Sequence, residues 1–202
     1  MKVLVTGFGP FENYNSNPAE MLAHHLSDVR PDVETCILPV VYGEAGEILL
    51  DELESLFPDL VISFGLNATI GYINLEEIAV NIRSSEVADN KGKTMTDTPI
   101  LENGPLAYRT RLPTVPLREC LRKSGIPAKL SYSAGVYICN EVFYLEMDWA
   151  YREGRNAGFV HIPMATEMVA GIPGLYRTPH IPLEMLKRAG ELVLDCTLNS
   201  IR

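Results

Sequence analysis

The stretch Lys2-Val-Leu-Val-Thr6 is an apolar run that predicts a short buried strand, and the turn Gly7-Phe-Gly-Pro10 ends it. A helix start follows at Asn17-Pro-Ala-Glu20. Asn17 can cap this helix, the proline suits the first helical position where no amide bond is lost, and Glu20 has the spacing of a capping box. This part of the chain therefore predicts a strand that leads through a turn into a helix.

Strands and helices alternate along the rest of the chain. Such alternation argues for a mostly parallel sheet flanked by helices, because parallel neighbours need helical crossovers that cover both faces. We expect one α/β domain over residues 1–202. The expected strands are 33–38, 59–64, 78–82, 129–133 and 159–162, and the expected helices are 44–57, 116–123, 139–151 and 182–200. The polar stretch 83–104 is too long for a plain connector and is expected to be functional or mobile.

The charge and hydropathy of the chain exclude several classes of protein. With 202 residues, 47% apolar residues and a net charge of −9, it has the composition of a soluble globular domain whose field repels nucleic acid. The longest apolar run near the N-terminus is Val3-Leu-Val5, too short for a signal peptide, and no stretch is long enough to span a bilayer. We therefore expect a cytoplasmic protein with neither nucleic acid nor membrane as a partner.

The cysteines and histidines have no metal-binding pattern. Four cysteines lie far apart without a C-x-x-C pair, and four histidines lack the spacing of zinc ligands. We therefore expect no metal and no disulfide framework. All four cysteines are expected to be free thiols, with packing roles for Cys36, Cys120 and Cys196.

Cys139 has the position of a nucleophile. It follows the small-residue turn Ala134-Gly135 and opens the helical pattern that runs to Tyr151. A helix N-terminus carries about half a positive charge, which favours a thiolate, and its unpaired N–H groups can form an oxyanion hole. The competing interpretation is a small buried hydrophobe, which most free cysteines are.

His161 is the candidate base. It lies in the strand Gly158-Phe-Val-His-Ile-Pro163, which Pro163 ends, so its imidazole should emerge at the carboxyl edge of the sheet, where α/β active sites gather. An imidazole near a thiol can accept its proton and later protonate a leaving amine. A core histidine without a catalytic role is the alternative.

Glu76 and Glu77 precede the apolar run Ile78-Ala-Val80. Adjacent strand side chains point to opposite faces, so one of the two carboxylates can turn inward and orient a histidine while the other stays in water. Paired glutamates are, however, more often surface residues, and this interpretation also stays open.

Taken together, these segments resemble the pyroglutamyl peptidase I family of pyrrolidone-carboxylate peptidases, from Lys2 to about Pro163. The similar segments are Val3-Leu-Val-Thr-Gly-Phe-Gly-Pro-Phe11, Asn17-Pro18, Leu38-Pro-Val40, Phe64-Gly-Leu66, Glu76-Glu-Ile-Ala-Val-Asn81, Asp89-Asn-Lys-Gly92, Gly125-Ile-Pro127, Ser133-Ala-Gly135, Cys139-Asn140 and Phe159-Val-His-Ile-Pro163. The resemblance implies an α/β/α sandwich around a mixed sheet, no cofactor, small peptides with N-terminal pyroglutamate as substrates, and a homo-oligomer, often a tetramer.

The resemblance also implies roles for individual residues. It makes Cys139 the nucleophile, His161 the general base and acid, and Glu76 the group that orients His161, with Glu77 as the solvent-facing neighbour. Pyroglutamate is a neutral lactam, so an apolar slot should select it. The implied lining residues are Phe8, Phe11, Val87 and Ile138.

The chain departs from the family pattern in three places. Glu86 stands where the family has an arginine near the active site, Glu77 replaces the arginine of the Glu-Arg-x-Ala-x-Asn motif, and Glu12-Asn13 replaces glycine. A glutamate aimed at Cys139 would oppose a thiolate and a developing oxyanion. We expect Glu86 to turn outward, or Arg83 to supply the missing cation.

Three functions compete at this point. The first is a cysteine peptidase that hydrolyses the N-terminal pyroglutamyl residue through a thioester. The second is a catalytically weak or silent relative that binds a small ligand or a pyroglutamyl peptide. The third is a phosphate-using enzyme such as a nucleoside phosphorylase, which the sequence disfavours because Gly7-Phe-Gly-Pro10 is too aromatic to cradle a phosphate.

Overall fold

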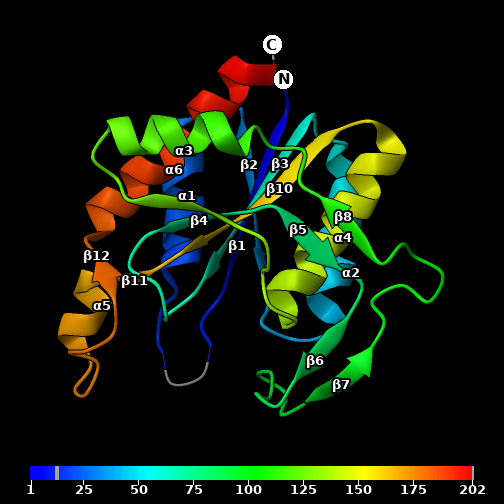
Figure 1. The fold of residues 1–202 in the computed structure, drawn as a ribbon, viewed down its shortest axis with the longest axis horizontal. Coiled ribbons are helices and arrows are strands. Elements are labelled where there is room, and N and C mark those ends of the chain that lie inside the picture. The colour runs from blue at the N-terminus through cyan, green and yellow to red at the C-terminus, as the bar shows by residue number, and fades with distance from the viewer. Residues whose placement is uncertain (12–13, 202) are drawn as a thin grey trace.

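The computed structural model describes residues 1–11 and 14–201. Six strands of this part of the chain form a central sheet in the order β2-β1-β3-β10-β4-β9 (Figure 1). They are β1 (Val3–Phe8), β2 (Val33–Leu38), β3 (Leu60–Leu66), β4 (Ile73–Glu76), β9 (Ala128–Ser131) and β10 (Asn156–Ile162). Neighbouring strands are parallel except β10 and β4, which are antiparallel.

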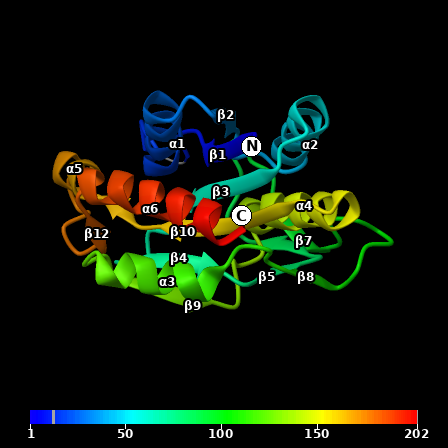
Figure 2. The same cartoon turned by 90° about the horizontal axis from the view of Figure 1, so that it is seen from above.

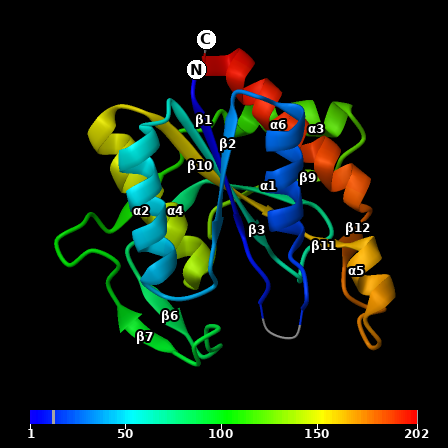
Figure 3. The ribbon, with the colours of Figure 1, turned by 180° about the vertical axis from the view of Figure 1, so that it is seen from behind.

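Helices cover both faces of the sheet. One face packs against α1 (Pro18–Val29), α3 (Thr114–Lys123) and α6 (Leu183–Ile201), and the other against α2 (Glu44–Leu56) and α4 (Ile138–Glu153), as Figures 2 and 3 show. Each face has its own cluster of buried apolar side chains. The fold is therefore the expected α/β/α sandwich with a mostly parallel, mixed sheet.

Smaller elements lie around this sandwich. The strand β5 (Ile78–Val80) pairs with β8 (Ala107–Arg109), β6 (Arg83–Ser85) with β7 (Met95–Thr98), and β11 (Met164–Ala165) with β12 (His180–Ile181), and α5 (Thr166–Gly171) lies between the last two strands. The long polar stretch expected to be a loop thus contains the β6–β7 hairpin. No helix in the described ranges combines the length and the apolar composition that crossing a bilayer requires.

The predicted strand and helix at the N-terminus are present. The Asn17 side chain accepts a hydrogen bond from the Ala19 N–H at 3.0 Å, as a helix cap, and donates to the Gly9 carbonyl at 3.0 Å. Gly7 lies so close to α1 that a Cβ there would be 2.5 Å from the Ala19 carbonyl oxygen. The glycine therefore lets β1 continue through Phe8, two residues beyond the expected end, while α1 starts directly against it.

The strand β4 was not predicted. In its sequence Ile-Asn-Leu-Glu, the apolar Ile73 and Leu75 alternate with the polar Asn74 and Glu76, and all four side chains are buried. Four residues with two polar side chains lack the apolar run that identifies a central strand. A partner on each side, β10 and β9, stabilises the strand instead.

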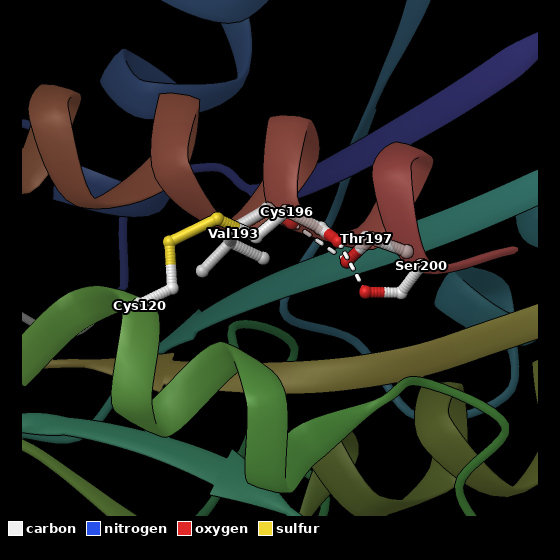
Figure 4. Close-up of a disulfide and its surroundings, with 5 residues drawn as sticks. All are labelled: Cys120, Val193, Cys196, Thr197 and Ser200. Atoms are coloured by element: carbon white, nitrogen blue, oxygen red, sulfur yellow. Dashed lines mark hydrogen bonds between the residues drawn. A yellow bond between two sulfur atoms is a disulfide. The ribbon is translucent and has the colours of Figure 1, made fainter.

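The expectation of four free thiols is wrong for one pair. Cys120 of α3 and Cys196 of α6 form a disulfide across a sequence separation of 76 residues (Figure 4). Cys36 and Cys139 are free. Local spacing predicts chelating pairs, but it carries no information on two helices that pack together from distant parts of the chain. The disulfide connects α6 to α3, its neighbour on the same face of the sheet.

Removing this crosslink should lower stability without affecting catalysis directly. The double variant Cys120→Ser/Cys196→Ser should lose about 3 to 4 kcal/mol of unfolding free energy, because the bond restricts the unfolded chain. Chemical denaturation with and without a reducing agent measures this loss. Equal stabilities, or four reactive thiols in the unfolded, unreduced protein, would contradict the assignment.

Candidate active site

His161 and Glu76 form a buried pair in the central sheet. His161 lies opposite Asn74 in the register of β10 and β4, which makes Glu76 its diagonal neighbour on the same face. The imidazole Nδ1 and the Glu76 Oε1 are 2.8 Å apart, and the two residues are only 4% and 1% exposed. Because a carboxylate accepts hydrogen bonds, Nδ1 carries the proton and Nε2 is the nitrogen left for another partner.

That partner is Cys139. It is the second residue of α4, and its thiol is hydrogen-bonded to the His161 imidazole. Gly65, paired in register with His161, makes room for the sulfur: a Cβ there would lie 3.0 Å from Sγ and 2.7 Å from the Phe159 ring. Phe159 in turn contacts the imidazole edge-on, with ring centroids 4.9 Å apart.

The surroundings of His161 favour its charged form. Burial lowers the pKa of His161, but the hydrogen bonds to Cys139 and Glu76 outweigh it and raise the pKa to about 9. With a pKa of about 9, the imidazole is in its charged form near neutral pH. The arrangement thus places a thiol, an imidazole and a carboxylate in the order that acyl transfer by a cysteine requires.

Two hollows meet at Cys139. A small cavity of about 90 Å³ has a mostly apolar lining, and a wider groove of about 490 Å³ runs past the thiol and the imidazole. The small cavity is lined by Phe8, Phe11, Asn17, Val40, Leu66, Tyr137, Ile138 and Cys139. The groove is lined by Phe11, Tyr14, Leu66, Asn67, Ala68, Ser133, Ala134, Gly135, Tyr137, Cys139 and His161.

Three of the four expected lining residues, Phe8, Phe11 and Ile138, line the small cavity. Val87 does not belong to its described lining; it follows β6 in a surface loop and is 50% exposed. Sequence reasoning missed Tyr137, which borders both hollows. Its ring is tilted against that of Phe11 and edge-on to that of Tyr42, at centroid distances of 5.7 and 5.2 Å. Its position directly before the helix of Cys139 was the available signal.

Glu77 is buried, contrary to the expectation that it faces solvent. It is 1% exposed, accepts a hydrogen bond from the Thr114 hydroxyl, and accepts another from Arg109 Nε at 3.2 Å. The expectation assumed one continuous strand, but β4 ends at Glu76 and β5 begins at Ile78. At this break both carboxylates turn inward, Glu76 to His161 and Glu77 to α3.

Glu86 and Arg83 take different positions. Glu86 is exposed in the loop after β6, whereas Arg83 Nη2 donates to Glu141 Oε1 at 2.7 Å. Glu12 and Asn13, the third departure from the family pattern, lie outside the described residues. Within residues 1–11 and 14–201, no group of three or more His, Cys, Asp or Glu side chains is arranged to hold a metal ion.

A thiol at a helix start, bound to an imidazole that a carboxylate orients, defines the site of a cysteine hydrolase on an α/β sandwich. The sequence profile of the pyroglutamyl peptidase family matches residues 1–198. The chain belongs to this family.

Individual relatives support the assignment over nearly the whole chain. The pyrrolidone-carboxylate peptidase of Pyrococcus furiosus is 38% identical over 96% of this chain and 99% of its own length. That of Halalkalibacterium halodurans is 37% identical over 96% and 97%. A crystal structure of pyrrolidone carboxyl peptidase from P. furiosus superposes with a TM-score of 0.93 at 36% identity and covers all of both chains.

Gly65 tests the packing of the site. Gly65→Ala should reduce turnover at least about tenfold, because a misplacement of about 1 Å is enough for such a loss and the new methyl group meets both Cys139 and Phe159. Gly171→Ala is the matched control, since a Cβ there has no atom within 4 Å. Steady-state kinetics on both variants makes the comparison. Full activity of Gly65→Ala would contradict the geometry.

Proposed function

We propose that this protein is a cysteine peptidase that hydrolyses the N-terminal pyroglutamyl residue from small peptides. The observation that carries the proposal is the position of Cys139 between a small apolar cavity and an open groove, hydrogen-bonded to His161. The small cavity would hold the lactam ring and the groove the rest of the peptide. The relatives described above are named for this activity, which favours the peptidase over the silent binding protein.

Recognition rests on the absence of charge in the substrate. The described lining of the small cavity carries no lysine, arginine, aspartate or glutamate, so a ring without a free amine can enter without an ion pair. A peptide with an ordinary N-terminal ammonium would have to lose its hydration there, at a cost that the apolar walls do not offset. Phe8, Phe11 and Ile138 supply the apolar contacts.

The reaction proceeds in two steps. The Cys139 thiolate attacks the pyroglutamyl carbonyl carbon, and the resulting oxyanion is stabilised at the start of α4. The Asn140 and Glu141 N–H groups donate to the Tyr137 carbonyl at 3.0 and 3.2 Å, so the Cys139 N–H is the donor nearest the reacting carbon. The C–N bond breaks as His161 protonates the amine, which leaves a thioester.

The second step returns the enzyme to its starting state. His161, now neutral, takes a proton from water, and the hydroxide formed attacks the thioester carbonyl. The C–S bond breaks, pyroglutamate leaves, and the thiolate–imidazolium pair is restored. Glu76 touches neither substrate nor sulfur in this scheme: it keeps the proton on Nδ1 and Nε2 directed at Cys139.

We also propose a homo-oligomer, tetrameric by the family resemblance, with peptides as its only other partners. The cytoplasmic location stays a prediction from the sequence. Gel filtration with light scattering would measure the mass of the assembly, and a monomer at micromolar concentration would contradict this part of the proposal.

Release of a fluorophore from an L-pyroglutamyl amide measures the proposed activity. The protein should turn over this amide and leave the corresponding L-prolyl amide, which carries an ammonium in place of the lactam, essentially intact. Cys139→Ala should lose at least about three orders of magnitude in kcat, as removal of a nucleophile does. Equal turnover by wild type and Cys139→Ala, or none by the folded wild-type protein, would refute the proposal.

The pH profile should report His161. A group with a raised pKa keeps its proton up to that value, so kcat/KM should fall as the pH rises through about 9, where the imidazolium that protonates the leaving amine is lost. Glu76→Gln should move this alkaline limb to lower pH, because the carboxylate that favours the imidazolium is gone. Glu77→Gln, a change at an equally buried neighbour bound to Thr114, should leave the limb in place. A limb that moves in neither variant would contradict the role of Glu76.

A further inference from the structure

Glu141 is a buried carboxylate in the first turn of α4, two residues after Cys139. Its side chain is fully buried, and its Oε1 accepts hydrogen bonds from Arg83 Nη2 at 2.7 Å and from the Gly43 N–H at 3.0 Å. Gly43 has a φ of 82° and caps the start of α2. One oxygen thus connects the helix of the nucleophile to β6 and to α2.

Arg83 is the first residue of β6, the strand that leads into the loop carrying Glu86. Its side chain is only 16% exposed, and Nη1 also donates to the Pro99 carbonyl at 3.2 Å. The backbone next to it is joined to α4 and its approach: the Ser84 N–H donates to the Val136 carbonyl at 2.9 Å, and Asn140 Nδ2 donates to the Ile82 carbonyl at 3.0 Å. The ion pair therefore lies inside a seam of hydrogen bonds between β6 and α4.

The pair has an electrostatic consequence for Cys139. The N-terminus of α4 favours negative charge, and both Cys139 and the Glu141 carboxylate lie in its first turn. An unneutralised carboxylate two residues away would disfavour a thiolate, because like charges in a poorly hydrated site repel. Arg83 removes this conflict by neutralising Glu141.

The other ionisable groups nearby do not replace Arg83. Burial raises the pKa of Tyr42 to about 12, so its hydroxyl stays neutral. Asp89 accepts from the backbone N–H groups of Tyr42, Lys91 and Lys93, which use its oxygens. On the far side of Cys139, His161 and Glu76 form the pair already described. Arg83 is thus the cation bound to Glu141 in the described part of the chain.

The same seam supports the wall of the small cavity. In the loop after β6, the Ala88 carbonyl accepts from the Tyr137 hydroxyl at 3.1 Å, and Asn90 Nδ2 donates to the Pro10 carbonyl at 2.9 Å. Tyr137 borders both hollows. The contacts between β6 and α4 therefore hold two features in place: the residues that shape the small cavity, and the Arg83 guanidinium that pairs with Glu141.

We propose that Arg83 and Glu141 are positioning residues for the peptidase reaction. Arg83 neutralises Glu141, two residues from Cys139 on α4, and holds β6 against the wall of the small cavity. The inference rests on the proposed role of Cys139 as nucleophile. It also assigns a function to Arg83 other than the one expected from the sequence, since Arg83 compensates a carboxylate of this chain rather than reaching toward the thiol in place of Glu86.

The pH dependence of Cys139 alkylation by iodoacetamide tests the charge argument. Mass spectrometry of the Cys139 peptide separates this thiol from Cys36, and the readout needs no peptidase activity. Arg83→Met should move the midpoint of the profile up by about one pH unit, and Glu141→Gln should move it down by about as much, because the two substitutions remove charges of opposite sign. The double variant should return close to wild type.

Turnover of the L-pyroglutamyl amide complements the alkylation profile. Arg83→Met should raise KM as well as lower kcat, since the small cavity loses support. The double variant should recover the pH profile of wild type but not its KM. Arg118→Met/Glu119→Gln removes a pair on α3 and serves as the control that leaves both profiles unchanged. Thermal melts accompany each variant.

Shifts in the same direction for both single variants, or no shift in either, would overturn the inference, because a merely structural pair cannot move the midpoint in opposite directions. If Arg83→Met does not fold, Glu141→Gln decides alone: a downward shift supports the inference and an unchanged midpoint overturns it. If the variants show these shifts in Cys139 alkylation but the wild-type protein does not turn over the amide, the proposed function is refuted and the charge relation between Arg83, Glu141 and Cys139 stands.

Discussion

The first turn of α4 packs against the carboxyl ends of β3 and β10, and the rest of the site depends on how closely it does so. Gly65 and His161 are paired in register on these two strands, and the missing side chain of Gly65 leaves space for the Cys139 sulfur beside the imidazole. Any residue larger than glycine would separate helix and sheet. The hydrogen bond between thiol and imidazole, the pKa of His161 and the junction of the two hollows all follow from this contact.

The protein buries several carboxylates and stabilises each in a different way. Glu76 binds an imidazole, Glu77 binds Thr114 and Arg109, and Glu141 binds Arg83 and a backbone N–H. Glu146, five residues after Glu141 on α4, has no cationic partner among the described residues: burial raises its pKa well above the usual value, and its partner is the Ser63 hydroxyl. Buried acids without a partner are costly, so a chain of net charge −9 keeps them only where a donor or a proton is at hand.

Local signals in the sequence predicted local structure well. The cap at Asn17, the strand Val33–Leu38 and the helix that begins near Cys139 follow from patterns of a few neighbouring residues, and all are present. The misses share a different cause. The Cys120–Cys196 disulfide, the burial of Glu77 and the pairing of Arg83 with Glu141 each join residues that are far apart in sequence, which periodicity cannot register. Val87 was assigned to the lining of the substrate slot by resemblance alone. Its surface position depends on the β6–β7 hairpin, and a polar stretch of sequence does not predict such a hairpin.

The unequal size of the two hollows has a consequence for how the proposed enzyme treats a long peptide. In the proposed mechanism the small cavity holds the lactam ring, and the remainder of the peptide lies in the open groove. After a single cut, the shortened peptide presents a new ammonium, which the same cavity would have to strip of water before a second cut. The enzyme therefore unblocks a peptide without digesting it: each substrate molecule is processed once and released with a free amine, ready for peptidases that require one.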